Sequence, residues 1–60
     1  MNPYECYNIG IKWFNDRYDK TKIMSHDLRV VNSLLNQYYY GIAAQKELYY
    51  KLIELGAITK

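Results

Sequence analysis

The sequence predicts an all-α fold, either a small three-helix bundle or an open three-helix array. Hydrophobic residues recur at steps of three and four in three separate segments, as they do on one face of a helix. Residues that typically begin or end helices separate these segments: Asn2, Pro3, Ser25, Gly41 and Gly56. Strand-like runs such as 38–40 are short and lie inside helical periodicities. Residues 1–60 are therefore expected to form one domain, with helices at about 3–18, 26–40 and 43–55.

The first helix carries two apolar stripes. Asn2 is expected to cap its first amides, and Pro3 at the first helical position loses no hydrogen bond. The stripe predicted to face the core is Tyr4, Tyr7, Ile11, Phe14 and Tyr18; the second stripe is Cys6, Ile9 and Trp13. Gly10 lies between them, where a missing side chain permits a close approach. We expect one neighbouring helix to leave part of this surface uncovered.

The second and third helices are simpler. Ser25 is the predicted N-cap of the second helix, and Gly41 is predicted to end it in a left-handed conformation. Gly56 is predicted to stop the third helix. The inner stripes are Leu28, Val31, Leu35 and Tyr38 in the second helix, and Ala44, Leu48, Leu52 and Leu55 in the third.

Length limits what this core can do. A chain of 60 residues buries only about 60% of the surface of its unfolded form, so its core is thin and needs good packing or association. Cys6 is the single cysteine and His26 the single histidine, which excludes an internal disulfide and argues against a zinc site. No catalytic arrangement, phosphate-binding loop or metal cluster is recognisable, so we expect neither an enzyme nor a cofactor.

A lone cysteine suits a reducing compartment, and no basic segment followed by an apolar one opens the chain. We therefore expect a cytoplasmic protein. Every apolar run is shorter than the roughly 20 residues of a membrane span, so we expect no membrane association.

Tyrosine is the compositional oddity, with eight in 60 residues against one tryptophan and one phenylalanine. A large apolar ring with a polar tip is favoured at surfaces that are buried part of the time, which indicates an interface. The alternative is codon bias, because Asn, Lys, Ile and Tyr, which AT-rich genomes favour, make up 25 of the 60 residues. Such a bias would suit a low-GC bacterium, its phages or its mobile elements.

The leading functional hypothesis is a small regulatory or adaptor protein that docks on a larger protein, such as one acting on DNA, or on a second copy of itself. The predicted protein-binding residues are Ile9 and Trp13 with Tyr40 and Tyr50, since the two tyrosines fall on polar helix faces. The alternative is that the second helix ends at Tyr39, so that Tyr40 turns inward, and that Trp13 fills a gap between the first and third helices.

Two rival functions stay open. A nucleic-acid-binding protein would contact phosphates through Arg17, Lys20, Lys22 and Arg29, although the formal net charge is only +2. Around Gly10 and Gly41, a helix-turn-helix would require small and apolar residues at positions that hold other types. The same cations also suit a solvated loop at the end of the first helix. The second rival is a structural subunit of an assembly, with the apolar surface buried permanently.

Overall fold

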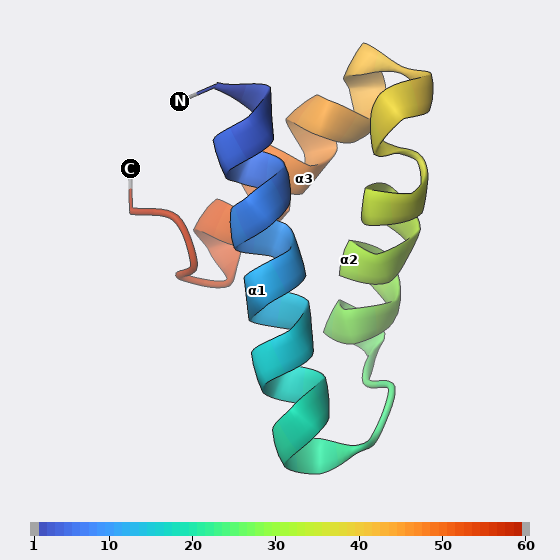
Figure 1. The fold of residues 1–60 in the computed structure, drawn as a ribbon, viewed down its shortest axis with the longest axis vertical. Coiled ribbons are helices and arrows are strands. Elements are labelled where there is room, and N and C mark those ends of the chain that lie inside the picture. The colour runs from blue at the N-terminus through green and yellow to red at the C-terminus, as the bar shows by residue number, and fades with distance from the viewer. Residues whose placement is uncertain (1, 60) are drawn as a thin grey trace.

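The computed structural model describes residues 2–59, which form three α-helices and one short 3-10 helix (Figure 1). In chain order these are α1 (Pro3–Thr21), α2 (His26–Asn36), η1 (Tyr38–Tyr40) and α3 (Ile42–Glu54). In Figure 1, α1 and α2 stand side by side and α3 crosses behind them. Each helix touches the other two, so the predicted all-α, three-helix fold is confirmed.

The α1 helix begins as predicted and ends later than predicted. The backbone N–H of Glu5 donates to Asn2 Oδ1 at 2.9 Å, and Pro3 occupies the first turn. The helix runs to Thr21, three residues beyond the expected end. Lys22 then closes it in the left-handed conformation with φ 55°, and its N–H donates to the Tyr18 carbonyl at 2.7 Å.

The second helix is shorter than predicted. Ser25 caps it as expected, accepting a hydrogen bond from the Leu28 amide at 3.3 Å, but α2 ends at Asn36 rather than at residue 40. The chain tightens into η1, where the Tyr40 N–H donates to the Gln37 carbonyl at 3.0 Å. Gly41 is extended, with φ −176°, and forms the N-cap of α3. The predicted left-handed helix end at Gly41 is therefore wrong.

The third helix ends as the sequence predicts. Gly56 adopts φ 80°, and the amides of Gly56, Ala57 and Ile58 donate to carbonyls in the last turn of α3. This left-handed closure satisfies carbonyl groups that a helix end otherwise leaves free. It also folds the C-terminal segment back, so that Ile58 is buried in the core.

The core lies where the three helices meet. Its buried hydrophobic residues are Cys6, Leu28, Val31, Leu34, Tyr38, Ala44, Leu48, Leu52 and Ile58. From α1 only Cys6 and Gly10 are buried, and half-buried side chains of both stripes pack around them. The predicted core stripe is thus wrong in its position, most clearly at Tyr4, which is 71% exposed.

Both stripes of α1 have neighbours within the same chain. Tyr7 meets Tyr38 with 5.1 Å between ring centroids, which covers one side of α1. On the other side, Trp13 lies beside Leu55 and Ala57 at the end of α3. Both stripes are therefore covered in part, because the folded-back C-terminal segment adds surface that three separate helices would lack, while Tyr4 stays 71% exposed.

Candidate functional site

Exposed hydrophobic side chains gather at one end of the molecule. Among residues 2–59, the large hydrophobic side chains that are mostly exposed are Tyr4, Ile23, Tyr39, Tyr40, Ile42 and Tyr50. Four of them surround the α1 start and the turn from η1 to α3, and we call them the tyrosine end: Tyr4, Tyr39, Tyr40 and Ile42. Ile23 lies in the connection at the opposite end (Figure 1). The tyrosine end is the candidate functional site.

Tyr38 anchors this end to the body of the protein. Its side chain is buried, and its hydroxyl donates to the Pro3 carbonyl at 2.7 Å, which ties η1 to the start of α1. The Gln45 side-chain amide donates to the Tyr38 carbonyl at 3.1 Å, which ties η1 to α3. The short helix that carries Tyr39 and Tyr40 is thus held from both sides.

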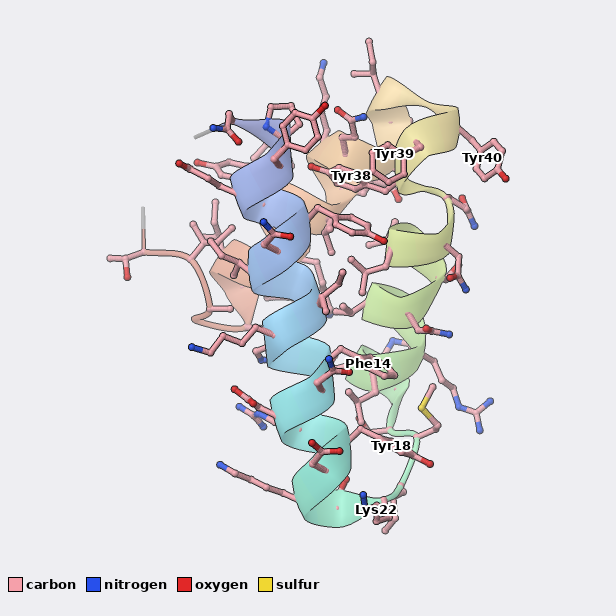
Figure 2. The ribbon with its side chains drawn as sticks, in the orientation of Figure 1. Phe14, Tyr18, Lys22, Tyr38, Tyr39 and Tyr40 are labelled. Atoms are coloured by element: carbon pink, nitrogen blue, oxygen red, sulfur yellow. The ribbon has the colours of Figure 1, made fainter. Side chains whose placement is uncertain are left out.

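The two exposed tyrosines of η1 point in different directions. The Tyr39 ring lies toward α1 (Figure 2), 5.2 Å from the Tyr7 ring and 5.7 Å from the Tyr38 ring between centroids. Tyr40 points away from the bundle (Figure 2) and is 90% exposed. The alternative in which Tyr40 turns inward is wrong, because the 3-10 turn directs Tyr38 into the core instead.

The four predicted protein-binding residues do not share one surface. Ile9 and Trp13 are half-buried, pack against the core and line a shallow groove beside Ala57. Tyr40 and Tyr50 are exposed on other elements, η1 and α3. The structure therefore places Trp13 between α1 and the end of α3, as the alternative interpretation had it. Its Nε1 is buried without a hydrogen-bond partner among the described residues.

Tyr50 is connected to the tyrosine end through a groove. A cavity of about 250 Å³ runs between the start of α1 and α3, and Pro3, Ile42 and Tyr50 contribute to its lining. The Tyr50 ring also meets the Tyr49 ring edge-on, at 5.6 Å between centroids. Tyr50 thus borders the tyrosine end on the α3 side.

The predicted phosphate-binding residues are mostly engaged within the chain. The Lys22 ammonium lies 3.6 Å from Asp19 and 5.6 Å from the centre of the Tyr18 ring, and Figure 2 shows Lys22 beyond Tyr18 at the foot of α1. The Arg29 Nε donates to the Met24 carbonyl at 3.2 Å. Arg17 stacks on Trp13, with its guanidinium carbon 5.4 Å from the ring centre. Lys20 is exposed in the last turn of α1. Contacts within the chain thus engage three of the four cations.

Titratable groups indicate a structural role at Cys6 and Tyr38. Burial raises the pKa of the Cys6 thiol above its ordinary value, which keeps it protonated and unreactive. Burial also raises the pKa of Tyr38 to about 12. Among residues 2–59, no group of three or more His, Cys, Asp or Glu side chains is placed to hold a metal ion. None of the helices described has the length and hydropathy that crossing a membrane requires.

Tyr4, Tyr39 and Ile42 were missed as exposed residues by reasoning from the sequence. Tyr4 falls on the stripe assigned to the core, and Tyr39 flanks the inner stripe of the second helix. Tyr38 is buried and its two neighbours Tyr39 and Tyr40 are exposed because α2 ends early. Helical periodicity does not predict this early end. Comparison with known proteins adds no assignment, because no protein-family model, curated protein or solved structure matches the chain.

Proposed function

We propose that the protein is a small docking module that binds another protein through its tyrosine end and acts without catalysis. The observation that carries this proposal is the grouping of Tyr4, Tyr39, Tyr40 and Ile42, each at least 65% exposed, on one end of the fold. Tyrosine is enriched at binding hot spots, where its ring supplies contact area and its hydroxyl a hydrogen bond.

The exposed area is large for so small a protein. With about 200 Å² for each tyrosine side chain, the three tyrosines of this end expose roughly 450 Å² together. That is more than half of the ~800 Å² that each partner contributes to a standard interface. The largest exposed apolar patch of a typical monomeric protein measures ~300–600 Å² and is often functional.

The tyrosine end is also held in place before binding. The hydrogen bonds from Tyr38 to Pro3 and from Gln45 to Tyr38 fix η1 against both α1 and α3. Ordering a side chain at an interface costs roughly 0.5–1.5 kcal/mol, and a rigid support lowers the total cost of binding. The module would then act by occupying a site on the partner, or by shifting the partner toward the state that fits this surface better.

A matched pair of variants tests the proposal. Ile42 and Ile23 are the same residue type with nearly equal exposure, 69% and 67%, at opposite ends of the fold. The wild-type protein, Ile42→Ser, Ile23→Ser and Tyr40→Ser would each be used to capture partners from extracts of the native host. A protein partner should be retained by the wild type and by Ile23→Ser, and lost with Ile42→Ser and Tyr40→Ser.

The outcomes divide clearly. Equal retention by all four proteins, or loss with Ile23→Ser alone, would contradict the choice of surface. Sedimentation at micromolar concentration shows whether the partner is a second copy of the chain. A dimer that Tyr40→Ser dissociates would assign the tyrosine end to self-association, and a monomer would leave a different protein as the partner.

A further inference from the structure

A second hollow lies far from the tyrosine end and has a different chemistry. A cavity of about 290 Å³ opens between the C-terminal half of α1, the start of α2 and the end of α3. Its apolar walls include Trp13, Leu28 and Leu55, of which Leu28 is buried. This volume is at the lower limit of the ~300–1,000 Å³ of small-molecule sites, so the cavity suits a single ring or a short branched chain.

Some of the polar groups around the cavity already have hydrogen-bond or ion-pair partners, and others can still donate. Asp27 Oδ1 lies 3.0 Å from Lys51 Nζ, an ammonium that also pairs with Glu54 Oε2 at 2.7 Å, so Asp27 already has an ion-pair partner. The Thr21 hydroxyl donates to the Arg17 carbonyl at 3.2 Å. The Ser25 oxygen accepts from the Leu28 amide, which leaves the hydroxyl proton free to be donated.

Arg17 is the remaining charged group at the rim. Its guanidinium is stacked on Trp13 at 5.4 Å, and no acidic side chain of residues 2–59 lies within ion-pair distance of it. Stacking leaves the in-plane N–H groups of a guanidinium free to donate, in a geometry that matches a carboxylate. Of the two charged side chains that line this cavity, Arg17 is thus the one without an ion-pair partner among residues 2–59, and it stands next to apolar walls.

We propose that this cavity binds a small organic anion with an aromatic or branched aliphatic body, such as an arylalkyl carboxylate. The ring would lie against Trp13, Leu28 and Leu55, and the carboxylate would accept hydrogen bonds from Arg17 and from the Ser25 hydroxyl. The site is independent of the proposed docking function, because no residue of the tyrosine end lines it.

Phenylacetate is a suitable probe, and phenylacetamide is its neutral counterpart of the same shape. The chain has one tryptophan, so the indole N–H of Trp13 gives a single resolved signal in a ¹⁵N–¹H correlation spectrum. We expect phenylacetate to shift this signal and those of Leu28 and Leu55, with a Kd in roughly the millimolar range. Phenylacetamide should bind about fivefold more weakly, since it lacks the charge-assisted hydrogen bonds.

Arg17 and Arg29 are the two arginines of the chain and provide a matched control. Arg17→Gln should abolish the preference for the anion, whereas Arg29→Gln removes the same charge away from the cavity and should preserve it. Arg17→Lys keeps the charge and should restore part of the preference, which separates a lost contact from a damaged fold. The proposal is overturned if both probes bind equally, if both Gln variants weaken binding alike, or if the shifted signals lie elsewhere.

Discussion

A single methyl group at Gly10 tests the packing of α1 against the rest of the core. Gly10 is buried in the middle of α1. A Cβ atom built there would lie 3.1 Å from Leu35 Cδ2 and 3.3 Å from Leu48 Cδ2. Both distances are shorter than an optimal carbon–carbon separation of about 3.5–4.0 Å, so Gly10→Ala forces at least one leucine to move.

Two opposing effects set the magnitude. Replacing glycine by alanine inside a helix stabilises it by roughly 1 kcal/mol. Overpacking a core typically costs 1–3 kcal/mol, and Leu48 has no exposed surface into which it could retreat. We therefore expect Gly10→Ala to destabilise the protein by about 1 kcal/mol. For a domain of this size that corresponds to a decrease in Tm of roughly 4–8 °C.

A double-mutant cycle with Leu35→Ala separates the two effects. Leu35 provides the closest contact and is only half-buried, so its truncation removes the main clash at moderate cost. In the Leu35→Ala background, Gly10→Ala should become stabilising, with a coupling energy of about 1 kcal/mol or more. Urea unfolding followed by circular dichroism measures all four proteins.

The refuting result is specific. If Gly10→Ala alone stabilises the protein by about 1 kcal/mol, and the cycle shows no coupling, then α1 does not pack closely enough on Leu35 and Leu48 to require a glycine. The interpretation of Gly10 as the point of closest approach between α1 and the core would then be wrong.

Three further predictions follow from the backbone and from Tyr38. Gly41→Ser should stabilise the protein by about 0.5 kcal/mol, since Gly41 is an extended N-cap with no side-chain hydrogen bond. Gly56→Ser should destabilise it by about 1 kcal/mol, since Gly56 has φ 80°. Thermal unfolding of the two variants measures both effects. Tyr38→Phe should cost about 1 kcal/mol through the lost bond to Pro3. Because the folded-state pKa of Tyr38 is raised to about 12, its contribution to the free energy of unfolding is complete below pH 10 and is lost as the pH rises to 12. In unfolding experiments at alkaline pH, Tyr38→Phe should therefore lose stability less steeply with pH than the wild type. Lys22→Gly should stabilise by about 0.5–1 kcal/mol in urea unfolding, and Lys22→Ala should not, because Lys22 is left-handed.

The helices and most of their ends could be predicted because their causes are local. Asn2, Ser25 and Gly56 act on amides and carbonyls a few residues away, and each does in the structure what its position indicates. The early end of α2 could not be predicted in this way. In the short helix that follows it, the Tyr38 hydroxyl donates to the Pro3 carbonyl 35 residues away in the sequence, a contact that no local pattern indicates.

The candidate site was harder to predict than the fold, because exposure depends on which helices meet. Periodicity identifies two apolar stripes on α1, but it contains no information on whether α2, α3 or the folded-back end covers each of them. Trp13 is therefore half-buried where exposure was expected, and Tyr4 is exposed where burial was expected. The error at Tyr4 follows from the rotation of α1 that brings Cys6 and Gly10 to the centre of the core, and the error at Trp13 follows from the folded-back C-terminal segment beside it.

The positions of the tyrosines in the fold also bear on whether codon bias explains them. A bias toward AT-rich codons accounts for the number of tyrosines in a chain, but it acts on each position without regard to the fold. Here Tyr38 is buried and hydrogen-bonded, and the Tyr7 ring packs against it. Tyr4, Tyr39 and Tyr40 are exposed at the same end of the molecule. A buried, hydrogen-bonded tyrosine that holds exposed ones in place is what a rigid binding surface requires, and composition alone gives no reason for that arrangement.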